Sequence, residues 1–336
     1  MSLNTLEEIA SYIVSDGKGI LAADESNPTC TKRFDTIGVE STEESRRDYR
    51  EMLFRSGGIQ GNIGGVILFD ETIRQNAKDG TSLVDLMNSQ GALPGIKVDK
   101  GLQPIGDSDE TVTVGLEGLD ERLKEYALLG AKFTKWRAVI KIGNNLPTDN
   151  CIDANMKALA DYAKVVQDNG MVPMVEPEVL MEGDHSIEEC FAATERSLKS
   201  LFHHLKENGV NIKGTILKPN MVTAGSTCSN QASIDEVAQK TLDCLKANVP
   251  SELPAITFLS GGQSELLATA HLDAMNKIGG FDWKLSFSYG RALQAPTLKA
   301  WMGKPENIFI AQDALSHRAK MNQLAALGQW DKGLED

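Results

Sequence analysis

A lysine in an apolar segment is the clearest candidate for covalent chemistry. Lys218 follows Thr-Ile-Leu and precedes Pro219 in the segment ILKPNMV. Apolar surroundings favour the neutral form of a lysine, and a second ammonium group nearby, for which Lys135 is the candidate, favours it further. Because a neutral amine attacks a ketone to form an imine, these residues predict a Schiff-base lysine. The alternative is a lysine that pairs structurally with Glu176.

Three carboxylates could move protons near such a lysine. Glu176 and Glu178 stand two positions apart in the segment VEPE, on the same side of an extended chain. One could transfer a proton while the other holds its partner, or both could be solvated carboxylates at the end of a strand. Asp24, in the segment AADES, could be a base or the N-cap of a helix.

The segment LSGGQSE is typical of a site that binds an anion. Ser260, Gly261 and Gly262 fall between the end of an apolar run and the start of a helix. Two adjacent glycines bare the backbone N–H groups, and the Ser260 hydroxyl and the helix dipole also attract negative charge. The alternative is a tight turn without a ligand.

The segment SYGRA has the same form. Ser288 and Gly290 precede Arg291, whose guanidinium can hold a phosphate with two hydrogen bonds. Lys97 and Arg137 add positive charge to other apolar runs of the chain. Two anion sites in succession near the end of the chain, together with these cations, predict a phosphorylated small-molecule substrate.

The spacing of the histidines argues against a metal centre. The histidines are His185, His203, His204, His271 and His317. None has the H-x-x-x-H spacing of a helical metal site, and the adjacent His203 and His204 would point about 100° apart on a helix. All five are therefore predicted to be surface or capping residues, and no metal or other cofactor is expected.

Short apolar runs, separated by amphipathic stretches, are the elements that must position these side chains. The runs span residues 19–24, 64–70, 95–99, 133–142, 171–179, 214–222, 255–261 and 285–290. Most are continuously apolar, as in strands that helices cover. The segments STEE (41–44), SIEE (186–189) and SIDE (233–236) have the spacing of helix capping boxes, and Asn208-Gly209 is a typical helix end.

Eight strands that alternate with helices over about 300 residues predict a (β/α)8 barrel, the TIM barrel. An open doubly wound sheet is the alternative, but no G-x-G-x-x-G segment opens a helix after the first strand. Since no linker divides the chain, residues 1–336 are predicted to form one domain, with the barrel over about 15–303 and a C-terminal helix and tail over about 304–336. The charged residues of the runs fall at strand ends, where such barrels carry their chemistry.

The composition limits the partners and the location of the protein. The 336 residues carry a net charge of −13, which repels nucleic acid and anionic lipid. No apolar stretch reaches the roughly 18 residues that span a bilayer, and the acidic N-terminal segment does not resemble a signal peptide. The five cysteines include no C-x-x-C pair, which indicates a reducing compartment. The sequence therefore predicts a cytoplasmic protein that binds neither nucleic acid nor membrane.

Seven segments resemble the signature segments of class I fructose-bisphosphate aldolases. They are KGILAADES (18–26), GIKVDKG (95–101), KWRAVIKIG (135–143), VPMVEPEVL (172–180), ILKPNMV (216–222), FLSGGQSE (258–265) and FSYGRALQ (287–294). The resemblance implies a (β/α)8 barrel, usually a homotetramer, that acts in glycolysis and gluconeogenesis. It also implies a metal-independent lyase that cleaves fructose 1,6-bisphosphate to dihydroxyacetone phosphate and glyceraldehyde 3-phosphate.

The resemblance further implies roles for individual residues. Lys218 would form the imine with the ketone carbon of the substrate. Glu176 and Lys135 would assist imine formation and dehydration, with Glu178 alongside. Asp24 would take or return the hydroxyl proton in carbon–carbon cleavage. The phosphate at the ketose end would bind Ser260, Gly261, Gly290 and Arg291, and the far phosphate would bind Lys97 and Ser26, with Arg33 nearby.

The chain departs from the family pattern in two places. Many animal and plant members end in a tyrosine thought to help proton exchange, whereas no tyrosine follows Tyr289 here. Asn27, Pro28 and Thr29 stand where a Gly-Ser pair is common, and Pro28 removes a backbone donor. The alternatives are another imine-forming sugar-phosphate aldolase or a transaldolase on the same barrel, and a non-catalytic scaffold or cytoskeletal-binding protein.

Overall fold

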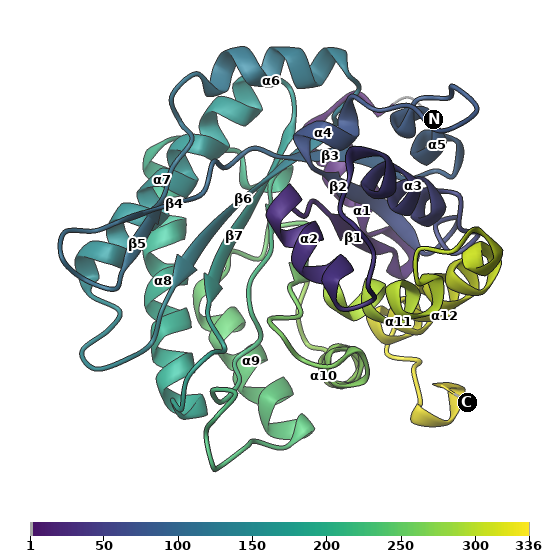
Figure 1. Cartoon of the computed structure of the whole chain (residues 1–336). Coiled ribbons are helices and arrows are strands. Elements are labelled where there is room, and N and C mark those ends of the chain that lie inside the picture. The colour runs from purple at the N-terminus through teal and green to yellow at the C-terminus, as the bar shows by residue number, and fades with distance from the viewer. Residues whose placement is uncertain (1–2, 336) are drawn as a thin grey trace.

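A computed structural model of the chain describes residues 3–335. Within these residues, eight parallel strands close into a barrel that helices surround (Figure 1). The barrel strands are β1 (Gly19–Ala23), β2 (Ile63–Leu68), β3 (Leu93–Lys97), β6 (Phe133–Ile140), β7 (Val172–Val179), β8 (Ile216–Leu217), β9 (Ala255–Phe258) and β10 (Lys284–Tyr289). They follow one another around the barrel in chain order, and β10 pairs with β1. The predicted (β/α)8 barrel is confirmed, and the open doubly wound sheet is wrong.

The strand bounds differ most from the predicted runs at β8. Each predicted run overlaps one barrel strand, but β8 has two residues whereas its predicted run spans 214–222. The regular strand ends at Leu217, two residues before Pro219. The backbone before it still belongs to the barrel wall, because Lys218 N donates to Val175 O at 2.8 Å. Lys218 therefore lies at the carboxyl end of β8.

Helices connect successive strands and cover the outside of the barrel (Figure 1). The α-helices are α1 (Leu6–Ile13), α2 (Asn27–Asp35), α3 (Glu43–Phe54), α4 (Asp70–Ile73), α5 (Leu83–Ser89), α6 (Leu119–Leu128), α7 (Asp149–Asp168), α8 (Ile187–Glu207), α9 (Ile234–Asn248), α10 (Glu265–Ile278), α11 (Arg291–Trp301) and α12 (Ile308–Ala326). The sequence did not predict the antiparallel hairpin of β4 (Leu102–Pro104) and β5 (Thr111–Thr113), which is inserted between β3 and α6. No helix of residues 3–335 is both long and apolar enough to cross a membrane.

One predicted capping box is confirmed in full. Ser186 accepts a hydrogen bond from Glu189 N at 3.2 Å, and the Glu189 carboxylate accepts one from Ser186 N at 2.7 Å. The same helix, α8, ends at Asn208, and Gly209 follows with φ +64°, as the Asn-Gly pair predicts. At Ser233 only the forward half forms, from Glu236 N to the hydroxyl.

The predicted capping box at 41–44 is wrong by one residue. The N-cap of α3 is Thr42, whose hydroxyl accepts from Ser45 N at 3.0 Å, and Ser45 Oγ accepts from Thr42 N at 2.9 Å. Ser41 instead accepts from Arg46 through its backbone and side-chain oxygens. Thr42, and not Ser41, therefore caps the helix.

Two apolar layers hold the barrel together. The inner layer fills the barrel with side chains such as Ile20, Phe133 and Met174, and α1 closes its N-terminal end. The outer layer packs the strands against the surrounding helices. Phe133 needs glycine on neighbouring strands, because a Cβ on Gly95 would lie 2.3 Å from its ring. This packed interior leaves the polar side chains at the carboxyl ends of the strands.

The C-terminal segment packs against α10 and α12. Arg318 and His317 on α12 both pair with Glu335, and Trp330 Nε1 donates to the same carboxylate at 2.8 Å. Trp330 N also donates to Asp273 of α10 at 3.0 Å. This part of the chain is therefore anchored to two outer helices. The predicted division into a barrel over 15–303 and a tail from 304, within one domain, stays a prediction.

Candidate active site

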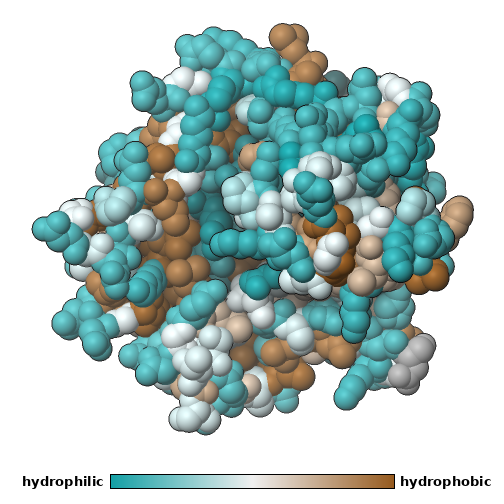
Figure 2. Space-filling model, viewed as in Figure 1, coloured by the Kyte–Doolittle hydropathy of each residue, from teal (hydrophilic) through white to brown (hydrophobic). Residues whose placement is uncertain are grey.

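The carboxyl ends of the strands surround a polar cavity of about 270 Å³. Its lining includes Asp24, Ser26, Arg33, Lys97, Lys135, Arg137, Glu176, Glu178, Lys218, Ser260, Gly261, Ser288, Gly290 and Arg291. All the catalytic and substrate-binding residues that the sequence predicts therefore line one cavity, except Gly262, which is adjacent to the lining residue Gly261. Figure 2 shows hydrophilic residues gathered at the centre of the view, near α2, and hydrophobic residues to the left.

A continuous line of ion pairs crosses the floor of the cavity. Lys218 Nζ lies 3.0 Å from Glu176 Oε1, and Lys135 Nζ lies 3.2 Å from Glu176 Oε2 without hydrogen-bond geometry. Lys135 Nζ also lies 2.8 Å from Asp24 Oδ2. The line therefore joins the ends or inner faces of β8, β7, β6 and β1. Lys218, Glu176 and Lys135 are all buried.

Alternation along β6 explains how Lys135 reaches this line. Trp136 points outward and packs on Tyr162 of α7, with ring centroids 5.4 Å apart. Because successive side chains of a strand point to opposite faces, Lys135 and Arg137 face the cavity. Arg137 forms an ion pair with Glu178 there.

The charges on this line stabilise one another. Burial alone would raise the pKa of Asp24, but the ammonium groups of Lys135 and Lys218 hold that pKa well below its ordinary value. Burial likewise opposes ionisation of Glu176, and the same two lysines together with Arg137 lower its pKa. Burial would lower the pKa of Lys135, yet Asp24 and Glu176 raise it. Asp24 and Glu176 are therefore ionised at neutral pH.

The two glycine-containing segments form one cradle. Gly261 and Gly262 have φ values of +58° and +91°, which L side chains rarely adopt. A Cβ on Gly262 would lie 3.3 Å from Arg291 Nη2, so the two segments are adjacent. The Ser288 hydroxyl is buried and has no hydrogen-bond partner, so it is available to a ligand.

The cavity is positive inside an acidic protein. Among the residues that line it, six are cationic, namely Arg33, Lys97, Lys135, Arg137, Lys218 and Arg291, and four are acidic, namely Asp24, Glu25, Glu176 and Glu178. The chain as a whole has a net charge of −13. The local excess of cations, the exposed backbone of the cradle and its free hydroxyl suit an anionic substrate.

The structure decides between several alternatives that the sequence leaves open. Glu176 and Glu178 are 3% and 8% exposed, so the prediction of solvated carboxylates is wrong. Asp24 is not an N-cap, because Ser26 holds that position in α2. Lys218 does pair with Glu176, and this ion pair is compatible with a nucleophile because the carboxylate can accept its proton.

The prediction that all five histidines lie at the surface or cap helices is wrong for two of them. His185 and His271 are buried. His271 Nδ1 donates to the side-chain oxygen of Gln263 at 2.6 Å, beside the cradle, and burial lowers its pKa to about 4. Burial also lowers the pKa of His185. Small and β-branched neighbours of His271 in α10 were the available signal of a buried helix face.

Two residues of the site were missed by the sequence reasoning. Glu25 is buried at the cavity edge and forms an ion pair with Arg33. Gln294, at the first turn of α11, donates to Glu25 Oε1 at 2.9 Å. The only signal for Glu25 was its position directly after Asp24 at the end of a predicted strand. Gln294 lies about 270 positions further along the chain, and no local pattern links it to Glu25.

Comparisons with known proteins identify the family. A family model described as Glycolytic, Fructose-bisphosphate aldolase class-I, matches residues 5–336. The chain is 53% identical over 332 residues to a probable fructose-bisphosphate aldolase class 1 of Xanthomonas axonopodis pv. citri, covering 98% of this chain and 99% of that protein. It is 51% identical over 321 residues to fructose-bisphosphate aldolase 4, cytosolic, of Arabidopsis thaliana, covering 95% and 82% respectively.

A solved structure agrees with these relatives. It is the fructose-bisphosphate aldolase from Plasmodium falciparum in complex with TRAP and a small molecule inhibitor, with a TM-score of 0.96 and 47% identity. The match covers 98% of this chain and 95% of that chain. The predicted family and the predicted lyase activity on fructose bisphosphate are confirmed. The chain belongs to the class I fructose-bisphosphate aldolase family.

Proposed function

We propose that the aldolase reaction of this chain proceeds through an imine between Lys218 and the ketone carbon of fructose 1,6-bisphosphate. The observation that carries this proposal is the line of ion pairs from Lys218 through Glu176 and Lys135 to Asp24. A lysine at 3.0 Å from a buried carboxylate has a proton acceptor at hand, and the carboxylate keeps its charge beside a second lysine.

Imine formation begins with a proton transfer from Lys218 Nζ to Glu176. The neutral amine attacks C2 of the ketose and forms a carbinolamine, and Glu176 returns a proton to the departing hydroxyl, which leaves as water. The product is a protonated imine. Lys135, at 3.2 Å from the same carboxylate, stabilises its negative charge whenever the proton has moved away. Arg137 holds Glu178 beside this group.

Cleavage then uses the imine as an electron acceptor. Asp24 takes the proton of the C4 hydroxyl, the C3–C4 bond breaks, and its electron pair forms an enamine with the imine nitrogen. Glyceraldehyde 3-phosphate leaves as the aldehyde product. Protonation of the enamine at C3 and addition of water then release dihydroxyacetone phosphate and restore Lys218. The low pKa of Asp24 keeps it as a carboxylate for the first step.

The two phosphates occupy opposite parts of the cavity in this proposal. Ser260, Gly261, Gly290 and Arg291 hold the phosphate of the ketose end, and Ser288, with its free hydroxyl, joins them. Lys97 and Ser26 hold the far phosphate. Arg33 borders the ketose-end group, because a Cβ on Gly290 would lie 3.6 Å from its Nη2. It also lines the same cavity as Lys97 and Ser26.

The chain requires no cofactor beyond the imine in this proposal. Within residues 3–335, no group of three or more histidine, cysteine or acidic side chains is arranged to hold a metal ion. We further propose a cytoplasmic homo-oligomer, a tetramer by family resemblance. The adjacent and exposed Phe309 and Ile310 of α12 support a surface that another copy covers.

Trapping the intermediate tests the mechanism. The protein is incubated with dihydroxyacetone phosphate and borohydride, and intact and peptide masses are measured. We expect one reduced adduct on the peptide that contains Lys218, and a chelator should not affect its formation. The adduct should be absent in Lys218→Met and present in Lys213→Met, the control variant at an exposed lysine. An adduct on another lysine would move the site. Chelator-sensitive cleavage without an adduct would indicate a metal enzyme, and neither adduct nor cleavage would favour a scaffold.

A further inference from the structure

Arg33 reaches the cavity from α2, and one side of its guanidinium is already occupied. Nη1 forms an ion pair with Glu25 Oε1, whereas Nη2 lies near Gly290. The side chain of Arg33 is 23% exposed, while that of Glu25 is 6% exposed. The buried carboxylate of Glu25 therefore holds Nη1 of the Arg33 guanidinium, and Nη2 remains directed at the cradle.

The carboxylate of Glu25 is itself fixed from two directions. Gln294 Nε2 donates to Glu25 Oε1 at 2.9 Å and to Ala22 O, in β1, at 2.7 Å. Gln294 Oε1 accepts from the hydroxyl of Tyr49 at 3.1 Å. All of these groups are buried, so the carboxylate has little freedom to follow a moving arginine.

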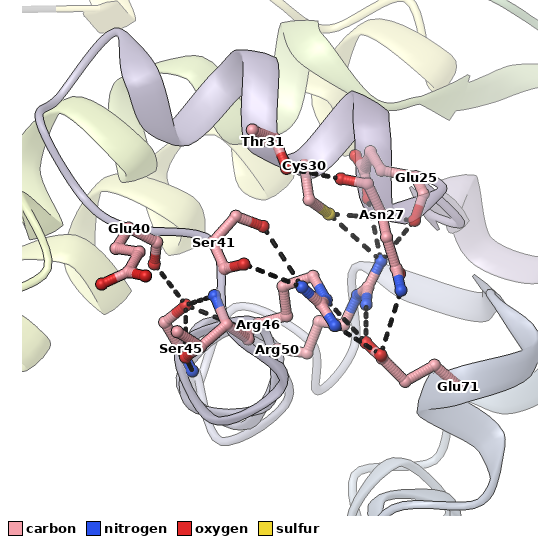
Figure 3. Close-up of polar contacts among 11 residues, drawn as sticks. Glu25, Asn27, Cys30, Thr31, Glu40, Ser41, Ser45, Arg46, Arg50 and Glu71 are labelled. Atoms are coloured by element: carbon pink, nitrogen blue, oxygen red, sulfur yellow. Dashed lines mark hydrogen bonds and ion pairs between the residues drawn. The ribbon is translucent and has the colours of Figure 1, made fainter.

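A second arginine joins the network behind Glu25. Arg50 is 1% exposed, and its Nη2 donates to Glu25 O at 2.7 Å and lies 3.8 Å from Glu25 Oε2. Its Nη1 lies 3.8 Å from Glu71 Oε1, and Glu71 also pairs with Arg46. Figure 3 shows this series of contacts from Glu25 through Arg50 to Glu71 and Arg46. The network thus extends away from the cavity into α3.

The position of Arg50 compensates for the negative charge of Glu25 near the phosphate-binding cavity. A carboxylate beside Arg33 would cancel part of the positive charge that attracts a phosphate. Arg50 offsets the charge of Glu25 from the side opposite the cavity, so the three groups Arg50, Glu25 and Arg33 together keep an excess of one positive charge. Glu25 can therefore orient Arg33 without making the cavity less attractive to an anion.

We propose that Glu25 is a positioning residue, which acts through Arg33 to set the affinity of the cavity for phosphorylated substrate. Gln294 and Arg50 support it by fixing its side chain. The proposal rests on the proposed function, in which Arg33 borders the residues that hold the phosphate of the ketose end. It differs from a purely structural role, in which the network would stabilise the fold and leave substrate binding unchanged.

The test compares steady-state kinetics of Glu25→Gln with those of the unchanged protein, using fructose 1,6-bisphosphate. Releasing one long side chain from a fixed orientation weakens binding by about three- to tenfold. We expect KM to rise by that factor and kcat to change by less than about twofold, because orientation of Arg33 affects the bound substrate and the transition state equally. In an Arg33→Gln background, the same substitution should have no further effect on KM.

Glu71→Gln is the matched control, because it removes a charge from the same network without touching Arg33. We expect it to lower the unfolding temperature and to leave KM unchanged. If KM is the same for Glu25→Gln and the unchanged protein, the proposal for Glu25 is wrong. It is also wrong if Glu25→Gln still raises KM in the Arg33→Gln background. In both cases the unchanged protein still cleaves the substrate and forms the Lys218 adduct, so the proposed function stands. Loss of the adduct in the unchanged protein would instead overturn the proposed function.

Discussion

The carboxylate of Glu176 lies 3.0 Å from the amine nitrogen of Lys218, deep in the cavity and away from bulk water. Its other oxygen faces Lys135. Glu176 can therefore accept a proton from Lys218, and the ammonium group of Lys135 stabilises the carboxylate charge before that transfer and again once the proton has left. This relationship connects the ionisation of the site with the covalent step, and the predictions below follow from it and from its surroundings.

Replacing the nucleophile should abolish cleavage and preserve the fold. In Lys218→Met, Glu176 keeps its ion pair with Lys135, so no buried carboxylate loses its last partner. We expect kcat to fall by about a thousandfold or more, with the thermal unfolding transition retained. Steady-state assays and circular dichroism check both parts. Cleavage near the original rate would contradict the assignment of Lys218.

Removing Lys135 should slow imine formation and shift the acid limb of the pH profile. Burial raises the pKa of Asp24, and Lys135 is the main charge that opposes this effect. In Lys135→Met the pKa of Asp24 should therefore rise, so that Asp24 becomes protonated and inactive at a higher pH. We expect imine formation to slow by about 100-fold.

The experiment on Lys135 measures kcat/KM against pH and the rate of adduct formation with dihydroxyacetone phosphate. Lys141→Met is the control, because Lys141 is exposed and pairs with Asp109 outside the cavity. An unshifted acid limb in Lys135→Met would show that Lys135 does not control the ionisation of Asp24.

A side chain at Gly261 should damage the phosphate cradle. The residue has φ +58°, and a Cβ there would lie 3.1 Å from Leu259 Cδ1. Gly261→Ala should cost about 1–2 kcal/mol of stability from the left-handed backbone, and it should raise KM for the bisphosphate. Gly57→Ala is the control, because Gly57 lacks a positive φ and nothing lies within 4 Å of its Cβ position. Equal effects of the two substitutions would argue against a special role of the cradle.

The buried His271 should make stability depend on pH. Burial lowers its pKa from 6.5 to about 4, so the unfolded chain binds the extra proton first as the pH falls. The contribution of neutral His271 to the free energy of unfolding is therefore complete above pH 6.5 and is lost as the pH falls towards 4. The total loss should be on the order of 3 kcal/mol.

Denaturant unfolding at several pH values checks this prediction. His271→Asn keeps a donor for Gln263 but cannot titrate, so its stability should vary less between neutral and acidic pH. Exposed His203, replaced by asparagine, serves as the control and should leave the pH dependence unchanged. A pH profile of His271→Asn identical to that of the unchanged protein would exclude His271 as the titrating group.

The sequence by itself determined the eight barrel strands, their alternation with helices and the types of residue at the strand ends, but not the hairpin of β4 and β5. Apolar runs identify the eight strands because the barrel interior buries one face of each strand and the surrounding helices bury the other. The adjacent glycines identify the cradle because only glycine readily adopts its backbone angles. The apolar neighbours of Lys218 indicated a nucleophile. All of these signals are local, so they can be read from short segments of the chain.

Only the tertiary structure decided which charges meet. Asp24 and Lys218 are almost two hundred positions apart, yet both join Lys135 and Glu176 because barrel closure places the carboxyl ends of their strands around one mouth. Barrel closure likewise brings Gln294, from α11, to the carboxylate of Glu25 that pairs with Arg33. Burial in this closed mouth then sets which groups ionise, because the strength of a charge interaction depends on distance and exclusion of water, and neither is encoded locally.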